Sequence, residues 1–264
     1  MNLKILITSV LFCSITSTKG QNNSGLIIYD FKYSNENSEV KTIESRLFFN
    51  DSVSIGVAYS TNFYTQNKVG INQETKGLGL NFMYGDLKGE IIHRNFKTEK
   101  ITLRFPKSAA LDEYTVQDNW TKIQWKIKDE NRRIDRFICK KAIGNYRGRR
   151  YTAWFTEEIP LPYGPFKLHG LPGIILEAED DEKIFSFNLK SVEYPTNLEF
   201  DVNEPIEKEN KTLYEHVYSQ DHIEEILLER LNVKMPKGIR LTKNPNKVDS
   251  KRKYRIEKLF EWEK

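Results

Sequence analysis

The chain contains little cysteine and no long apolar run after its first twenty residues. Of its two cysteines, Cys13 lies in the N-terminal apolar stretch, which leaves Cys139 alone in the rest of the sequence. A single cysteine excludes an internal disulfide, so the folded part must be stable through packing. No stretch after residue 20 approaches the ~20 apolar residues of a membrane-spanning helix, which excludes a transmembrane segment there.

An excess of charge of one sign is also missing. The 264 residues include 41 Lys and Arg against 37 Asp and Glu, and two of the basic residues, Lys4 and Lys19, lie in the first twenty positions. The remainder therefore carries a net charge of +2. A nearly neutral chain of this kind argues against a nucleic-acid partner. An apolar content of 38% with 12% aromatic residues is enough for a real core.

Recognisable catalytic motifs are absent as well. The sequence has no Gly-x-Ser-x-Gly elbow, no glycine-rich phosphate loop and no His-Glu-x-x-His pair. Its four histidines are scattered, without the spacing of a metal site. We therefore expect no metal, no cofactor and no assignable catalytic residue. The histidines are His93, His169, His216 and His222.

Two readings of the remaining reactive groups stay open. Cys139 is either a buried small hydrophobe, which we favour, or a thiol nucleophile. The acidic run from Glu177 to Glu182 is either a solvated hairpin tip or a weak cation site, and it lacks the glycine and spacing of a calcium loop. A hydrolase using the Cys139 thiol, or carboxylates near Glu177, is therefore the enzymatic alternative.

The first twenty residues have the pattern of a signal peptide. A basic start at Lys4 precedes an apolar run over residues 5–15, and the small residues Thr18 and Gly20 fit the positions that a signal peptidase reads. We predict a cleaved signal peptide over residues 1–20. The mature protein is then exported, to the periplasm, to the outer membrane or outside the cell.

From about residue 25 to residue 194 the sequence reads as short strands separated by polar turns. Residues 41–50 and 52–59 predict one hairpin, and residues 174–178 and 184–194 predict another. Many short strands with few helices indicate a mainly β protein (α+β) with a large, curved antiparallel sheet.

The run from Trp120 to Ile127 gives the clearest alternation in the chain. Large apolar residues alternate with Lys122, Gln124 and Lys126, which places the apolar ones on one face of a strand. The sequence therefore predicts a strand that spans this whole run.

The pattern changes after Pro195. Residues 196–210 read as a polar linker, and the helical period then predicts a tail over about residues 211–264. Its two amphipathic helices are expected at residues 221–232, where Asp221 and Glu224 resemble a capping box, and at residues 249–262. We expect residues 21–264 to form a single β-rich domain whose helices cover one face of the sheet.

Residues 147–179 are the most unusual part of the sequence. Prolines at 160, 162 and 165 forbid a helix and force an extended path. Pro172-Gly173 fits the centre of a type II turn, in which the glycine takes the positive φ. A rigid, aromatic-rich loop is therefore expected to lead through a tight turn into the strand at Ile174.

At these residues the chain resembles the GLPGLI family, named for its hexapeptide. The motif stands here as Gly170-Leu171-Pro172-Gly173-Ile174-Ile175, with two conservative exchanges. The resemblance extends to residues 139–142, 149–156 and 160–165. It implies an exported or envelope protein of Bacteroidota, and it supplies no catalytic residue because the family has no established activity.

Two interpretations of this segment remain open. In the first, the loop fastens the sheet, with its aromatic side chains buried beneath it. In the second, the rigid loop lines a groove that faces a ligand or partner, since preformed aromatic loops lose little entropy on binding. The cations Arg147, Arg149 and Arg150 either bind an anion or form a solvated strand end. The candidate binding residues are Trp154, Tyr163, Phe166, His169, Leu171, Pro172 and Arg149.

The expected function follows from these absences. Because no catalytic group can be assembled, we favour a non-enzymatic binding protein of the cell envelope. The expected partner is another envelope protein or an apolar small molecule. In the second case the protein is a periplasmic carrier, with its ligand between the sheet and the helices.

Overall fold

The computed structural model describes most of the chain after the predicted signal peptide. The described residues are 24–34, 39–59, 68–71, 78–81, 86, 88–108, 110–233, 235, 238, 240–242 and 255–263. The predicted signal peptide, residues 1–20, lies outside the described residues. No helix in the described ranges is long and apolar enough to cross a membrane.

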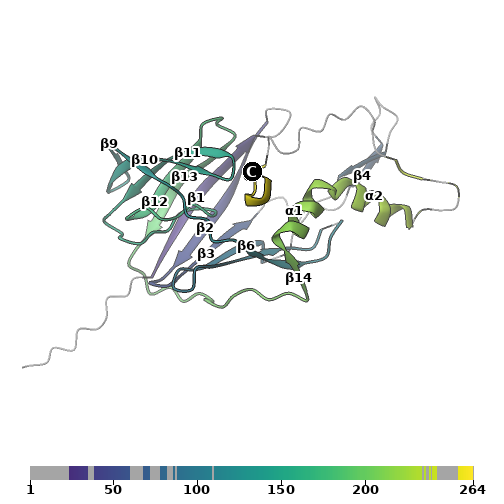
Figure 1. The fold of residues 1–264 in the computed structure, drawn as a ribbon, viewed down its shortest axis with the longest axis horizontal. Coiled ribbons are helices and arrows are strands. Elements are labelled where there is room, and N and C mark those ends of the chain that lie inside the picture. Colours follow the sequence, from purple (N-terminus) through teal and green to yellow (C-terminus); the bar gives the residue numbers. More distant parts are fainter. Residues whose placement is uncertain are drawn as a thin grey trace, which may run out of the picture.

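One large sheet dominates the molecule (Figure 1). Its twelve strands lie in the order β14-β8-β7-β6-β3-β2-β1-β13-β12-β11-β10-β9. Neighbouring strands are antiparallel, except that β14 runs parallel to β8. The predicted mainly β fold is confirmed. The strands are β1 Gly25–Ser34, β2 Val40–Phe49, β3 Val53–Tyr59, β6 Glu90–Asn95, β7 Lys100–Phe105, β8 Tyr114–Asp118, β9 Lys126–Ile134, β10 Phe137–Tyr146, β11 Arg149–Thr156, β12 Ile174–Asp180, β13 Phe185–Glu193 and β14 Glu209–Thr212, with a separate pair β4 Lys68–Ile71 and β5 Leu78–Asn81.

Both predicted hairpins are present. Strands β2 and β3 pair in antiparallel register, and the Asn50 side chain closes their turn by accepting from the amides of Ser52 and Val53 at 2.9 Å. Strands β12 and β13 pair in the same way. Alternation is the cause, because every second side chain of these strands enters the core.

The strand predicted from Trp120 to Ile127 is wrong over most of its length. Strand β9 begins only at Lys126, and residues 119–125 have no strand structure. These residues turn into the core instead, where Ile123 is buried and the indole N–H of Trp125 donates to the carbonyl of His169 at 2.8 Å. Alternation supplied the apolar side chains but no neighbouring strand to pair with.

The sheet is strongly curved. Asp118 ends β8, the second strand from one edge, and Arg147 lies in the turn between β10 and β11, near the other edge. Their side chains nevertheless meet at 2.6 Å. Only a sheet that curls can bring these two strand ends together, so it has an inner and an outer face.

The inner face is filled by the chain between β11 and β12. Tyr29 and Phe49 from the sheet, together with Tyr163, Leu168 and Leu171 from this connection, belong to one buried cluster. The long connection thus takes the place that a helix layer has in other folds of mixed class. Its packing makes the inner face a solid core.

The outer face of β3 and β6 is covered by the segment predicted as a linker. Phe200 packs against Phe48, with ring centroids 5.6 Å apart, and joins a small apolar cluster there. Glu204 accepts from Lys100, Thr102 and Gln117. Residues 195–208 are therefore a fixed cover of the sheet.

The helical tail differs from its prediction in two ways. A helix α1, Leu213–Asp221, precedes the expected one, α2, Ile223–Val233. The capping box is formed by Thr212 and Glu215, whereas Asp221 ends α1. The early helix escaped detection because Leu213 and Val217 are its only buried apolar residues.

The second predicted helix, 249–262, is wrong over its described residues. Residues 255–260 have no helical structure, and only a short 3-10 turn, η1 Glu261–Glu263, follows. This 255–263 segment lies between β11 and α1 (Figure 1). It is held there by ion pairs, which compete successfully with a weak helical period.

Candidate functional site

The seven candidate binding residues do not form one surface. Tyr163, His169, Leu171 and Arg149 are buried. Pro172 is exposed, Phe166 is half-buried, and Trp154 lies half-buried on β11 beneath the guanidinium of Arg132, 4.2 Å from the ring centroid. The structure places most of this set inside the molecule, as the fastening interpretation expects.

A buried arginine of β6 holds the connection in place. Arg94 is fully buried and donates to the carbonyls of Gly164 and Leu168, at 2.7 and 3.1 Å, and to the hydroxyl of Ser54. All three partners are neutral. Burial lowers the pKa of Arg94 to about 10.

The predicted turn at Pro172-Gly173 has a different physical basis. The positive φ belongs to Gly170, at 92°, and Gly173 does not have one. A Cβ at Gly173 would lie 2.0 Å from the carbonyl oxygen of Thr156. Gly173 is therefore required because two backbones approach closely, so the type II turn prediction is wrong.

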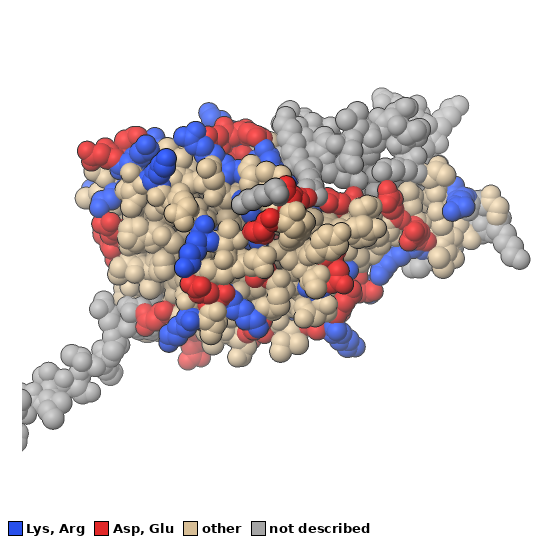
Figure 2. All heavy atoms as spheres, viewed as in Figure 1, with Lys and Arg blue, Asp and Glu red and all other residues tan. Residues whose placement is uncertain are grey.

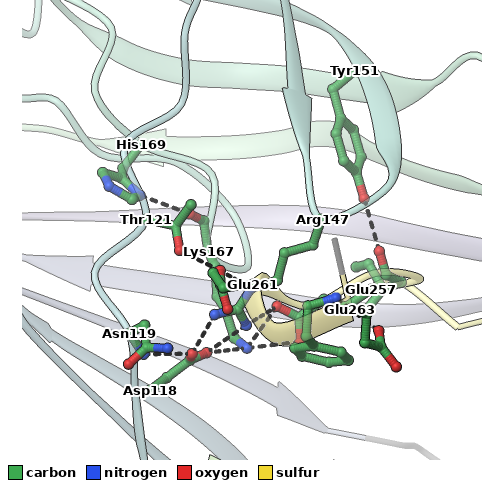
Figure 3. A network of polar contacts seen from close by, with 12 residues as sticks. Asp118, Asn119, Thr121, Arg147, Tyr151, Lys167, His169, Glu257, Glu261 and Glu263 are labelled. Atoms are coloured by element: carbon green, nitrogen blue, oxygen red, sulfur yellow. Dashed lines mark hydrogen bonds and ion pairs between the residues drawn. The ribbon is translucent and has the colours of Figure 1, made fainter.

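An ionic network occupies the space between the two ends of the sheet (Figure 3). Arg147 donates to both carboxylate oxygens of Asp118, at 2.6 and 3.0 Å, and the ammonium of Lys167 lies 2.5 Å from Asp118. The side chains of all three residues are at most 2% exposed. Such a buried cluster stabilises a fold only if its charges balance.

The 255–263 segment supplies the missing negative charge. Glu257 accepts from Arg147 at 2.6 Å and from Lys167 at 2.8 and 2.9 Å, and Glu261 accepts from Arg147 at 3.2 Å. Burial by itself would raise the pKa of Asp118, but Lys167 and Arg147 outweigh it and lower the pKa to about 2. The network is therefore ionised and internally paired at neutral pH.

The two other cations of the cluster at 147–150 are also paired. Arg149 is bound to Asp180 at 2.6 Å, with both side chains 1% exposed, and Arg150 lies 3.3 Å from Asp181. Neither the solvated strand end nor the solvated hairpin tip describes this pair. The sequence carried one signal for it, because basic and acidic runs flank two strands that pair, β11 and β12.

The groups with catalytic potential are shielded. Burial raises the pKa of the Cys139 thiol to about 12, so it is a protonated, packed side chain. His169 is buried, and burial together with Arg94 lowers its pKa to about 4. In the described part of the chain, no three His, Cys, Asp or Glu side chains are placed to hold a metal ion.

The space between the sheet and α1 is packed with side chains. Leu103 and Val116 from the sheet contact Leu213 and Val217 of α1, and Phe260 closes the cluster from the 255–263 segment. These five side chains are at most 6% exposed. Apolar side chains thus fill the place where the carrier hypothesis puts a ligand.

The most distinctive exposed surface lies beside the sheet edge formed by β14. A hollow of about 410 Å³ is bordered by β14 and α1. Tyr214 and Tyr218, one turn apart on α1, are 63% and 53% exposed, and Trp262 lies against Tyr214 with ring centroids 5.9 Å apart. We call this the β14–α1 groove. Its lining residues are Glu209, Asn210, Lys211, Tyr214, Glu215, Tyr218 and Ser219.

The opposite edge of the sheet has another character. Strand β9 is exposed on both faces over eight of its nine residues, and charged side chains dominate it. Charges on an edge strand discourage another chain from pairing with it. A hollow of about 420 Å³ nearby includes Arg132 and Lys190, which are paired with Glu177 and Glu44. Acidic and basic residues are interspersed on the face seen in Figure 2.

Comparison with known proteins supports the segment that stood out in the sequence. Residues 146–177 match a family model described as a protein of unknown function (Porph_ging). This range runs from the last residue of β10 into β12, so it includes Arg147, Arg149, Lys167 and the hexapeptide. The GLPGLI name itself stays a prediction. Among curated proteins, none matches the chain.

Two solved structures of PNGF-II are similar in fold. The P21 crystal form aligns with a TM-score of 0.49 at 13% identity, and the C2 form with a TM-score of 0.50 at 14% identity. Each alignment covers 78% of this chain and 33% of the PNGF-II chain. The chain thus spans a third of PNGF-II, and identities this low show a shared fold alone.

Proposed function

We propose that this chain is an exported, non-enzymatic interaction protein of the cell envelope, and that it binds a protein partner through the β14–α1 groove. The observation that carries the proposal is the pair of exposed tyrosines, Tyr214 and Tyr218, beside a short edge strand. Export is supported by the signal-peptide pattern of residues 1–20.

The chemistry of the groove suits recognition of a polypeptide. Tyrosine offers a large, rigid contact area with a polar end, and it is enriched where protein interfaces are most stabilising. An edge strand presents backbone donors and acceptors that an added strand can use. The charges of β9 discourage such pairing at the other edge, which leaves β14 as the accessible one.

A photo-crosslinking experiment tests the proposal. A photoreactive phenylalanine analogue is placed at Tyr214 or Tyr218 in cells that make the protein naturally. The matched control position is Ile206, which is 86% exposed and lies outside the groove. We expect a discrete crosslinked protein from both tyrosine positions and none from Ile206. Identical products from all three positions would overturn the proposal.

A second measurement checks dependence on the side chains. Native mass spectrometry compares the complex formed by the natural chain with that formed by Tyr214→Ser/Tyr218→Ser. Because both rings are exposed, the double variant should keep its stability within about 1 kcal/mol. We expect it to lose the crosslinked partner. Extra mass that is small and apolar would instead indicate a carrier.

A further inference from the structure

We propose that the turn between β10 and β11, together with Lys167, is a binding site for an acidic, aromatic peptide, and that the 255–263 segment occupies it in cis. The bound sequence reads Glu257-Lys258-Leu259-Phe260-Glu261 at its centre. A partner polypeptide with this spacing would compete for the same site. This inference does not depend on the β14–α1 groove.

The backbone of the segment is recognised as a peptide ligand is. The amides of Lys258 and Leu259 donate to the carbonyl of Arg147, at 2.9 and 3.2 Å. The guanidinium of Arg149 donates twice to the carbonyl of Arg255, at 2.9 and 2.6 Å. Such contacts accept any side chain, so they contribute affinity without restricting the sequence.

The specificity comes from charge. With the segment removed, Arg147 and Lys167 would share one nearby carboxylate, Asp118, in a place where both cations are 2% exposed. An excess buried cation is strongly unfavourable, so the vacated site requires an anionic ligand. Glu257 meets this requirement by binding both cations at once.

An aromatic anchor accompanies the two carboxylates. Phe260 is 6% exposed and belongs to the cluster formed with α1, and the guanidinium of Arg147 lies 5.0 Å from its ring centroid. Spacing of three and four residues from Glu257 places Phe260 and Glu261 against the same arginine. The site therefore selects Glu-x-x-Phe-Glu among acidic peptides.

The segment can leave the site without disturbing the sheet. None of its described residues belongs to a strand, and β10, β11 and β12 keep their pairing partners in its absence. A tethered ligand has a local concentration in the millimolar range, so it excludes micromolar competitors. Weakening the cis ligand should therefore open the site to a peptide in trans.

The test uses the full chain and a fluorescent peptide of residues 255–264, followed by anisotropy. The natural chain should bind the peptide weakly, because its own segment occupies the site. The variant Glu257→Gln/Glu261→Gln should bind it at least about tenfold more tightly, since loss of one partner of a buried charge pair weakens the cis contact. The chain variant Glu229→Gln, on the exposed face of α2, is the matched control.

The same two substitutions in the peptide complete the design. A peptide carrying Gln at both positions should fail to bind either chain. Equal affinity of the natural and double-variant chains for the unmodified peptide would overturn the inference, as would a folded double variant that does not bind.

A second route avoids any substitution in the network. A protease site inserted between residues 242 and 255 of the full chain allows the covalent link to be cut after folding. The labelled peptide should then replace the cut segment over time. A cut chain that stays folded and never exchanges its segment would contradict the inference.

Discussion

At the scale of single residues, the molecule buries an unusual number of charges and neutralises nearly all of them internally. Arg147, Lys167 and Arg149 are each paired with a carboxylate at 2.5 to 2.6 Å. Arg94 differs, because its partners are two carbonyls and a hydroxyl. These contacts place the loop between β11 and β12 with the accuracy that its backbone geometry requires.

The two glycines of the hexapeptide should respond differently to substitution. In Gly173→Ala the new methyl group would lie 2.0 Å from the carbonyl oxygen of Thr156, which forces β11 and the loop apart. We expect a loss of more than about 3 kcal/mol in the free energy of unfolding. Gly170→Ala meets only its positive φ, with open space around it, and should lose about 1 kcal/mol. Urea unfolding measures both, and equal losses would refute the close-approach argument.

Cys139 should be chemically inert in the native protein. It is 0% exposed and its pKa is raised by burial to about 12. A thiol reagent at pH 8 should therefore modify the protein only after denaturation. Rapid modification of the folded chain would restore the nucleophile hypothesis.

At the scale of elements, the two edges of the sheet and the tail show how local sequence is used. Strand β9 carries charges on both faces, whereas β14 is short and leads directly into α1. The N-terminus of α1 is fixed by reciprocal bonds between Thr212 and Glu215. This cap sets the direction in which Tyr214 and Tyr218 project.

Removing the cap should weaken α1 by a predictable amount. In Thr212→Ala the amide of Glu215 loses its acceptor, and we expect a loss of about 1 kcal/mol in the free energy of unfolding. Glu229→Ala, an exposed change in α2, should stay within about 0.5 kcal/mol. Thermal unfolding of the two variants side by side provides the comparison. A neutral Thr212→Ala would mean that tertiary contacts alone hold this helix.

At the scale of the whole molecule, the 255–263 segment connects regions that the sheet keeps apart. Ile256 packs on the core around β11, and Phe260 belongs to the cluster of β7, β8 and α1. Glu257 binds cations from the turn after β10 and from the loop before β12. The curvature of the sheet and the position of this segment therefore depend on each other.

The central carboxylate should make stability depend on pH in the acid range. The pKa of Asp118 is lowered from 3.8 to about 2 in the folded state, so its contribution is complete above about pH 4 and is lost as the pH falls through about 2. The expected loss is about 2 kcal/mol. Urea unfolding at pH 5 and pH 2.5 measures it.

A comparison with Asp118→Asn isolates this carboxylate. Glu204 also has its pKa lowered to about 2, through bonds from Lys100, Thr102 and Gln117 that outweigh burial, and it titrates in the same window. The variant should be less stable at pH 5 and should lose less stability between the two pH values. An unchanged pH dependence would assign the effect to Glu204.

Local patterns in the sequence determined much of the strand content. Alternation identified the β2–β3 and β12–β13 hairpins, because each strand buries one face beside a neighbour close in sequence. The burial of Cys139 followed from the lack of any partner residue around it. The prolines of the segment at 160–165 correctly excluded a helix there.

Only the tertiary structure decided where residues 120–125 and 255–260 went. Both have the periodicity of a regular element, but periodicity records which side chains are apolar and not which neighbour they meet. The first stretch found no strand to pair with and entered the core. The second is held by Arg147 and Lys167, which lie about a hundred residues earlier in the chain.

The sequence by itself determined that this is a mainly β protein without a disulfide, and it pointed to residues 147–179 as the part that organises the fold. The tertiary structure alone decided that the cations there face inward, because an arginine is equally at home in water or beside a buried carboxylate. Which of the two occurs depends on whether the curled sheet brings Asp118 and Asp180 within reach. That proximity is a property of distant strands, and no local pattern encodes it.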